Sequence, residues 1–514
     1  MRPLFILIFG FLIAACTLEQ SRPDIEKCSG SSGSEDEQIA ACTRAIATGQ
    51  LSKENLAITF YNRGYAWSRK GDFDRSIADY DEAIRLNPQY SRAYSNRGYA
   101  WNQKGDYDRA IADYNAAIRL NPRYAAAYSN RGYAWNQKGD YNRAIADYNE
   151  ATRLDPQDAV AYSNRGYTWS RKGDYGRAIT DLNEAIRLDP QYALAYSHRG
   201  YAWNGKGNYD RAITDLNEAI RLNPQLAQAY NRRGIVWDEK RDFDQALADF
   251  NEAIRLEPRY AEAYYNRGRT WEGKHDYDRA IADYTEAIRL NPKDTESYNN
   301  RGVVWVLKSD YDRAIADYNE AIRLNPQYAL AYANRGYARN GKGDYDQAIA
   351  DYNEAIRLDP KNAAVYYNRG YAQFYFGRFD ASAADFAESL RLNRNPYTVI
   401  GHYLAQSHSG SAKIARNEFI ANSASLDKEK WPGPIIDLIA GRRGSDALLK
   451  AAEHPDPQTR SYHICEAEFY IGEWHMLNQR LKEARDMLQR ATQDCPRNFV
   501  EFEGAASELR RLSD

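Results

Sequence analysis

The chain has 514 residues, with 69 Lys and Arg against 71 Asp and Glu, and a formal net charge of −2 at pH 7. This balance leaves no excess of positive charge for a phosphate backbone, so we expect no nucleic acid as a partner. After the first 15 residues, no apolar run is long enough to span a bilayer. Tyrosine is unusually frequent, with 42 copies.

Residues 1–15 read MRPLFILIFGFLIAA, in which Arg2 precedes an apolar run that ends directly before Cys16. The run has the length of a signal-peptide core and is too short for a spanning helix. The aliphatic residue, the two alanines and the cysteine at its end resemble a lipobox. This resemblance implies a bacterial lipoprotein that is acylated at Cys16 and, because Thr17 is not aspartate, the periplasmic face of the outer membrane as its location. The alternative is an ordinary signal peptide that is cut after Ala15.

The tripeptide Asn-Arg-Gly, or a close variant, returns every 34 residues. Ten copies without an insertion define ten units, and we number the places in each unit from position 1, which is Ala57 in the first. There, apolar and small residues follow helical spacing in two blocks. We expect helix A over 57–70 and helix B over 74–86, with Asp72 capping helix B and Pro88 following its end. The recurring arginines are Arg63, Arg97, Arg131, Arg165, Arg199, Arg233, Arg267, Arg301, Arg335 and Arg369.

This period resembles the tetratricopeptide repeat, with Gly64 at position 8, Ala83 at position 27 and Pro88 at position 32. The resemblance implies an all-α fold, a right-handed superhelical solenoid of stacked helix-turn-helix repeats. Where that family often has leucine at position 7, this chain has the recurring arginine. We predict that each arginine pairs with an aspartate from position 23, in a ladder that begins with Arg63 and Asp79. Exposed pairs of this kind would each contribute only ~0.2–1 kcal/mol.

Tryptophan occupies position 11 in eight units. Its spacing predicts core packing rather than an aromatic lane for a ligand, because position 11 faces the neighbouring helices. These residues are Trp67, Trp101, Trp135, Trp169, Trp203, Trp237, Trp271 and Trp305.

The ends of the array need caps, since a repeat cannot bury its apolar face alone. Glu37–Ala47 resembles a helix B and predicts an N-terminal cap, and 465–498 fits the repeat once more. The predicted organisation is a signal peptide over 1–15, an anchor and tether over 16–35, a cap over 36–56, ten repeats over 57–396, an irregular helical segment over 397–460, and a C-terminal repeat with a capping helix over 461–514.

Four cysteines remain beyond Cys16, and four cysteines allow three pairings. The sequence-local pairing Cys28–Cys42 and Cys465–Cys495 fits the expected fold best, because antiparallel helices bring the two ends of a hairpin together. The alternative is four buried free thiols.

The terminal block adds a narrower resemblance. Residues 468–472, 498–501 and 508–509 look like the tail of the new-lipoprotein-I family of outer-membrane tetratricopeptide lipoproteins. That resemblance implies an adaptor that brings a periplasmic protease and enzymes of peptidoglycan growth to their targets, and it implies a homodimer.

By resemblance to the family, positions 2, 5, 6, 9, 12 and 13 of helix A line a concave groove. Rings and amides in such a groove suit an extended peptide, so we predict a peptide-binding site. The alternative is that these residues only maintain the repeat. The predicted groove residues are Tyr65, Tyr99, Tyr133, Tyr167, Tyr201, Tyr337, Tyr371, Asn96, Asn130 and Asn164.

The middle units lose this tyrosine and gain acidic residues. We predict an acidic groove segment that prefers a basic partner; the alternative is an ordinary solvated face. Its residues are Asp238, Glu239, Glu262, Glu272 and Glu296.

No histidine stands at a metal-binding spacing, and no phosphate loop or nucleophile elbow occurs. We therefore expect no catalysis, no metal and no cofactor. The prediction is a protein-binding scaffold or adaptor at the bacterial envelope, held to the membrane by lipid. The alternatives are a structural component of a secretion or pilus assembly, and a binder of glycan strands.

Overall fold

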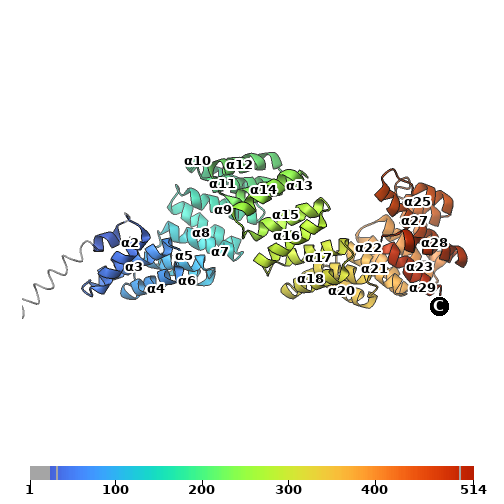
Figure 1. Ribbon diagram of the computed structural model, residues 1–514, viewed down its shortest axis with the longest axis horizontal. Helices are drawn as coiled ribbons and strands as arrows, with labels where there is room; N and C mark the ends of the chain where they lie inside the picture. The colour runs from blue at the N-terminus through green and yellow to red at the C-terminus, as the bar shows by residue number, and fades with distance from the viewer. Residues whose placement is uncertain (1–23, 31–32, 497–498, 514) are drawn as a thin grey trace, which may run out of the picture. The chain divides into compact units, whose positions relative to one another are not determined.

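The computed structural model describes residues 24–30, 33–496 and 499–513, and in this part of the chain the regular structure is α-helical, without a strand. The chain forms two compact units, which divide between Leu256 and Glu257 (Figure 1). This division directly follows helix B of the sixth predicted repeat, which extends to residue 260. Each unit is a solenoid of stacked helix hairpins.

Unit 1 contains a cap helix and six hairpins, each made of helix A and helix B of one repeat. Its helices are α2 (Glu35–Ala47), α3 (Lys53–Arg69), α4 (Phe73–Leu86), α5 (Ser91–Gln103), α6 (Tyr107–Leu120), α7 (Ala125–Gln137), α8 (Tyr141–Leu154), α9 (Ala159–Arg171), α10 (Tyr175–Leu188), α11 (Ala193–Gly205), α12 (Tyr209–Leu222), α13 (Ala227–Glu239) and α14 (Phe243–Leu256).

The ends of the hairpin helices follow local rules. Gly71 takes the left-handed conformation, with φ of 81°, between α3 and α4. The side chain of Asp72 then accepts a hydrogen bond from the backbone N–H of Arg75 at 3.0 Å, which confirms the predicted cap. The B helix ends at Leu86, ahead of Asn87 and Pro88, because proline cannot continue a helix.

Close packing inside each hairpin depends on a glycine facing a large residue. A Cβ added to Gly132 would lie 3.1 Å from the ring of Tyr148, whose side chain is fully buried. In α9 and α10 the same places hold Gly166 and Leu182, and the added Cβ would lie 2.7 Å from Leu182 Cγ. The glycine therefore sets the distance between the two helices of the hairpin.

Unit 2 continues with four repeats and then a further set of helices. Its helices are α15 (Ala261–Gly273), α16 (Tyr277–Leu290), α17 (Thr295–Leu307), α18 (Tyr311–Leu324), α19 (Ala329–Gly341), α20 (Tyr345–Leu358), α21 (Ala363–Tyr375), α22 (Phe379–Leu392), α23 (Pro396–His408), α24 (Ala412–Ser423), α25 (Gly433–Ile439), α26 (Ser445–Ala451), α27 (Pro457–Leu477), α28 (Leu481–Asp494) and α29 (Val500–Arg511).

The C-terminal helices of unit 2 enclose a large apolar core. Helices α27 and α28 form a hairpin, and a Cβ on Gly472 would lie 2.7 Å from Leu488 Cγ, as in the α9–α10 hairpin. Helix α29 packs against α27, α28 and α21. The core thus joins the last predicted repeat of the array to the C-terminal hairpin.

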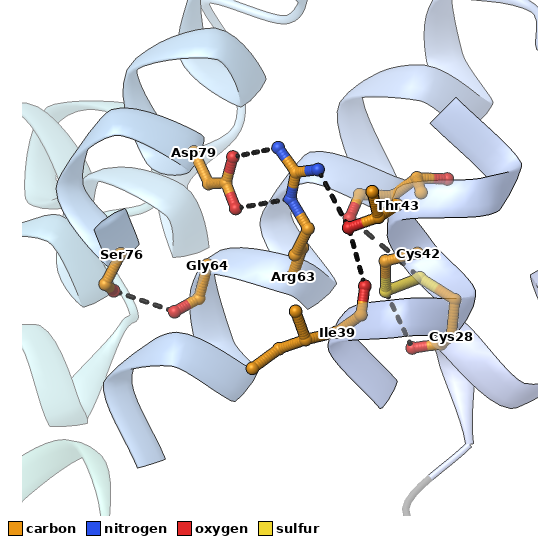
Figure 2. A network of polar contacts seen from close by, with 9 residues as sticks. Cys28, Ile39, Cys42, Thr43, Arg63, Gly64, Ser76 and Asp79 are labelled. Carbon is orange, nitrogen blue, oxygen red and sulfur yellow. Dashed lines mark hydrogen bonds and ion pairs between the residues drawn. A yellow bond between two sulfur atoms is a disulfide. The ribbon is translucent and has the colours of Figure 1, made fainter. Parts of the chain in front are cut away.

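Both sequence-local disulfides are present. Cys28 and Cys42 are bonded, with their Cα atoms 4.8 Å apart, and the Cα atoms of bonded Cys465 and Cys495 are also 4.8 Å apart. The N-terminal bridge ties residues ahead of the cap to α2 (Figure 2).

The predicted acylation site, Cys16, lies outside the described residues. Among the helices that the structure describes, none combines the length and the apolar character needed to cross a membrane.

Candidate functional site

The A helices form one face of each unit. Within unit 1, successive A helices contact one another from α3 to α13, and in unit 2 α17, α19, α21 and α23 do the same. Most position 2 and position 9 side chains lie at the surface of these helices, which we call the A-helix face.

A forked ion pair holds each of the ten hairpins together. The arginine at position 7 of helix A donates from Nε and Nη2 to both carboxylate oxygens of the aspartate at position 23 of the same repeat, at 2.5–2.9 Å. This confirms the predicted ladder, but the aspartates are buried rather than exposed. They are Asp79, Asp113, Asp147, Asp181, Asp215, Asp249, Asp283, Asp317, Asp351 and Asp385.

The third guanidinium nitrogen, Nη1, donates a hydrogen bond to a side chain of the preceding repeat. Arg131 Nη1 donates to Asn115 on the preceding B helix at 2.6 Å, and Arg335 bonds Asn319 in the same way. At the start of the array, Arg63 Nη1 donates to Thr43 of α2 at 3.2 Å (Figure 2). The cap therefore stands in for a preceding B helix.

The position 11 tryptophans are partly buried rather than enclosed in the core. They pack on the hairpin cores with part of the ring, and an arginine covers the ring in seven of the eight repeats at 4.2–4.7 Å from the ring centre. Cation–π contact with arginine is thus part of the packing at this position.

The predicted tyrosines divide into three groups. Tyr65, Tyr99 and Tyr133 are 46%, 42% and 42% exposed, which is high for large side chains in a packed array. Tyr167, Tyr201 and Tyr337 are half-buried. We call the tyrosines of unit 1, Tyr65, Tyr99, Tyr133, Tyr167 and Tyr201, the tyrosine lane.

Tyr371 does not lie on the surface. It is only 3% exposed, and its hydroxyl lies 3.2 Å from that of Tyr470 in the C-terminal core. Helices beyond the array, which the repeat pattern does not reveal, cover this ring, so the prediction that Tyr371 lines the groove is wrong.

Exposed aliphatic side chains at position 2 accompany the tyrosines. Ile58, Val160 and Leu330 are 45%, 47% and 49% exposed on the A-helix face. The sequence placed position 2 in the groove by resemblance, but only the measured exposure distinguishes these three from buried apolar residues.

Most of the position 6 asparagines are half-buried, and some have structural partners. Asn96 donates from Nδ2 to the Tyr61 hydroxyl of the preceding A helix at 3.0 Å, and Asn300 bonds Tyr265 likewise. This supports a role for Asn96 in joining repeats. Asn130 and Asn164 occupy the same place, and their predicted role in binding stays a prediction.

The predicted acidic groove segment is distributed over both units, with Asp238 and Glu239 in unit 1 and the other three residues in unit 2. Glu262 and Glu296 are exposed. Glu272 is half-buried and accepts a hydrogen bond from the Tyr284 hydroxyl at 2.8 Å, and burial raises its pKa. Glu272 therefore has a structural partner, and the preference for a basic ligand stays a prediction.

A pocket of about 340 Å³ opens where α21 and α22 meet α23 in unit 2. Its lining includes Tyr367, Asn368, Asn393 and Asn395. Rings and amides of this kind can contact a peptide backbone.

The C-terminal core also buries several glutamates, which the sequence analysis missed. Glu466 accepts hydrogen bonds from the Tyr397 hydroxyl at 2.8 Å and from Trp431 Nε1 at 2.7 Å. Burial, with Glu466 nearby, raises the pKa of Glu501 to about 8. Burial and the charge of Glu473 raise the pKa of Glu508 to about 7. The repeat pattern gave no signal for their burial, because that burial depends on how the C-terminal helices pack together in the core.

His408 belongs to the same core. Burial opposes its protonation, but its Nε2 lies 3.0 Å from Glu473, and this partner raises the pKa of His408 overall. Within the part of the chain that the structure describes, no three His, Cys, Asp or Glu side chains are grouped so as to hold a metal ion.

Ten tandem repeats of two stacked helices define a helical-repeat protein. Family models described as tetratricopeptide repeat match residues 61–120, 103–159, 170–227, 272–329, 227–260, 317–350 and 363–396, and one described as TPR repeat matches 340–375. Together these matches cover more than half of the chain. The chain belongs to the tetratricopeptide-repeat proteins, and it carries the repeats of a scaffold for protein–protein interaction.

Parts of the chain are similar to solved structures of tetratricopeptide-repeat proteins. A tetratricopeptide repeat protein from Parabacteroides merdae is 20% identical, with 46% of this chain and 93% of that chain covered and a TM-score of 0.41. A thermophilic TPR protein of Thermus thermophilus is 23% identical over 35% of this chain and 99% of that one, with a TM-score of 0.34. YrrB, described as a TPR protein with an unusual peptide-binding site, is 22% identical over 36% and 95%, with a TM-score of 0.29.

Proposed function

We propose that this protein is a non-enzymatic scaffold of the bacterial envelope that holds partner proteins on its A-helix face. The observation that carries the proposal is the set of large side chains left exposed there. Tyr65, Tyr99 and Tyr133 occur on three successive A helices and are each more than 40% exposed. Rigid rings supply contact area at a low cost in conformational entropy, so they suit recognition of an extended peptide.

Site-specific photo-cross-linking tests this proposal. A benzophenone amino acid at Tyr99 on the A-helix face should capture partner proteins in intact cells. The same group at Ala112, an exposed residue on helix B of the same repeat, is the matched control. Equal capture at both sites, or none at Tyr99, would contradict a binding role for the A-helix face.

A triple Tyr65/Tyr99/Tyr133→Ser variant complements the cross-linking. It removes the exposed rings without touching the buried tyrosines of the hairpins, so the helical content should not change. Partner recovery in affinity capture should fall by about tenfold or more, because exposed aromatic side chains often dominate binding energy. Unchanged recovery from a variant with native circular dichroism would remove the tyrosine lane from the proposal.

We propose further that a lipid on Cys16 holds the scaffold on the periplasmic face of the outer membrane. The lipobox-like sequence ahead of Cys16 supports this, and several acyl chains would anchor the chain stably. Metabolic labelling with an alkyne fatty acid should mark the wild type and not Cys16→Ser. A wild-type chain that is cut after Ala15 and stays unlabelled would leave a soluble exported protein instead.

The C-terminal resemblance suggests the kind of partner. We propose that the scaffold recruits a periplasmic protease or enzymes of peptidoglycan growth. Mass spectrometry of the Tyr99 cross-links would then identify soluble enzymes. Fixed subunits of a secretion or pilus assembly among the captured proteins would favour the structural alternative.

A further inference from the structure

Two arginines on the A-helix face of unit 1 differ from the arginines of the ladder. Arg171 lies at the end of α9, and Arg232 lies on α13, at the place where most repeats have asparagine. Each ladder arginine binds a buried aspartate. In the described part of the chain, neither Arg171 nor Arg232 forms an ion pair with a carboxylate.

Aromatic rings hold both guanidinium groups in place. Arg232 Cζ lies 5.4 Å from the centre of the Tyr167 ring and 5.5 Å from that of Tyr201. Arg171 Cζ lies 5.9 Å from the same Tyr167 ring and 5.5 Å from Tyr141. The two positive charges therefore converge on one tyrosine, although they come from repeats four and six.

Few of their N–H groups are used. Arg232 Nη1 donates to Ser197 Oγ at 2.8 Å, and Arg171 Nη1 donates to the Tyr167 hydroxyl at 3.4 Å. A guanidinium has five donors in a planar fork, so most of the donors on each group remain available to a ligand.

The floor beneath the two arginines consists of neutral side chains, of which His198 and Ser163 are buried. His198 stacks on Tyr167, with ring centres 4.5 Å apart, and its Nδ1 lies 3.0 Å from Ser163 Oγ. Burial and the nearby charge of Arg232 hold the pKa of His198 well below its usual range. Burial also raises the pKa of Tyr201, against the opposing charges of Arg171 and Arg232. His198, Tyr167 and Tyr201 thus place no negative charge beside the arginines.

We propose that Arg171 and Arg232 form a receptor for a carboxylate side chain of an extended acidic peptide segment. A planar carboxylate matches the guanidinium fork and accepts charge-assisted hydrogen bonds from it. The tyrosine lane next to the pair supplies contact for the rest of the segment. The inference rests on the proposed function and adds to it the charge of the partner in unit 1.

Fluorescence anisotropy with the full-length protein tests the receptor. The probes are three labelled peptides that alternate serine with glutamate, glutamine or lysine. The glutamate peptide should bind at least about tenfold more tightly than the glutamine peptide. The affinity of the glutamate peptide should fall as salt is added. The lysine peptide should bind most weakly at this site.

The variants use residues that other repeats already carry. Arg232→Asn restores the position 6 consensus, and Arg171→Gln copies Gln103 and Gln137. Each change should weaken binding of the glutamate peptide by about tenfold and leave the glutamine peptide unaffected. Arg119→Gln, at an exposed arginine of α6, changes the net charge equally and should have little effect.

Equal affinity for the three peptides, or equal losses in Arg232→Asn and Arg119→Gln, would overturn the receptor. If peptide binding fails in this way but Tyr99 still cross-links to partner proteins, only the receptor is refuted. If Tyr99 also captures no partner protein, the proposed scaffold is refuted as well.

Discussion

At the scale of single residues, the forked Arg–Asp pair distinguishes this array. Its aspartates are buried, and the guanidinium groups are only about one fifth exposed, as for Arg131 at 20%. A pair in this setting behaves differently from a surface pair, because removing one partner leaves a buried charge without compensation. The ladder therefore contributes more to the integrity of each repeat than surface salt bridges would.

Arg131→Ala should lower the free energy of unfolding of unit 1 by about 3 kcal/mol, since Asp147 would remain buried and unpaired. The double variant Arg131→Ala with Asp147→Ala removes both charges and should lose less stability than the sum of the losses in Arg131→Ala and Asp147→Ala. Urea unfolding followed by circular dichroism measures the effect. The exposed Arg119→Ala is the control and should change stability little. Additive losses in the double variant would show that the pair is not coupled.

The buried carboxyl groups of unit 2 make its stability depend on pH. The pKa values of Glu466, Glu501 and Glu508 are raised in the folded state, that of Glu501 to about 8, so these groups bind more protons in the folded chain than in the unfolded chain at neutral pH. Stability contributed by Glu501 is therefore complete below the unfolded pKa and is lost as pH rises through about 8.

The midpoint of thermal unfolding of unit 2 should fall between about pH 5 and about pH 9. Glu501→Gln should flatten this dependence, because glutamine carries no charge in either state. Glu483→Gln, at an exposed glutamate of α28, should leave the slope unchanged. A wild-type midpoint that rises with pH over this range would contradict the assignment.

The sequence located many of the site residues but could not rank their exposure. Tyr65 and Tyr371 occupy the same place in their repeats, yet one is 46% exposed and the other 3%. The difference comes from the C-terminal helices that cover Tyr371, which are distant in sequence. The sequence did not single out Arg171 and Arg232 for a related reason. Both guanidinium groups lie near the Tyr167 ring, although the two arginines belong to different repeats. The pattern of a single repeat cannot show such a contact between repeats.

At the scale of helices, the position 8 glycine controls the approach within a hairpin. A Cβ on Gly166 would lie 2.7 Å from Leu182 Cγ and 3.0 Å from the Ala178 carbonyl oxygen. By contrast, a Cβ on Gly176, in the first turn of α10, would meet its nearest atom at 3.6 Å, an ordinary contact.

Gly166→Ala should therefore destabilise unit 1 by about 1–3 kcal/mol through overpacking. Gly176→Ala should stabilise it by about 0.5 kcal/mol, because alanine loses less backbone entropy in a helix. Hydrogen exchange of the α9 and α10 amides would resolve both effects locally. If the two substitutions acted with the same sign, the packing argument would fail.

Helix boundaries in the array were predictable to within a few residues. The expected helix B over 74–86 is α4, Phe73–Leu86, and the expected helix A over 57–70 is α3, which starts earlier, at Lys53. Ser52 caps α3 through its side chain, ahead of the repeat's first position, and this local signal was overlooked. The segment over 397–460 was expected only as irregular helices, because it lacks a period; there the structure has α23, α24, α25 and α26.

At the scale of the whole molecule, each unit contains one disulfide that lies outside the ten repeats. Cys28–Cys42 closes a loop beside the cap in unit 1, and Cys465–Cys495 spans a sequence separation of 30 in unit 2. Terminal repeats have a neighbour on one side only, so they are the parts of a solenoid most prone to unfold. The two bridges thus reinforce the cap helix of unit 1 and the C-terminal hairpin of unit 2.

Cys465→Ser with Cys495→Ser should lower the stability of the C-terminal hairpin by about 3–4 kcal/mol, the value expected for a loop of this length. Differential scanning calorimetry of the full chain should show a lower transition for unit 2 and an unchanged one for unit 1. The Cys28→Ser/Cys42→Ser variant should show the reverse pattern. A uniform shift of both transitions would mean that the bridges do not act locally.

The hydrogen bond from a position 7 arginine to the preceding B helix bears on how the number of repeats can change. Arg131 meets Asn115 and Arg165 meets Asn149, so the junction chemistry is the same at both places. Excising residues 125–158 would bring Arg165 to Asn115 and recreate the junction that Arg131 made. Unequal recombination between copies of the repeat can therefore shorten or lengthen the protein in whole steps, and natural length variants of this array should differ by multiples of one repeat.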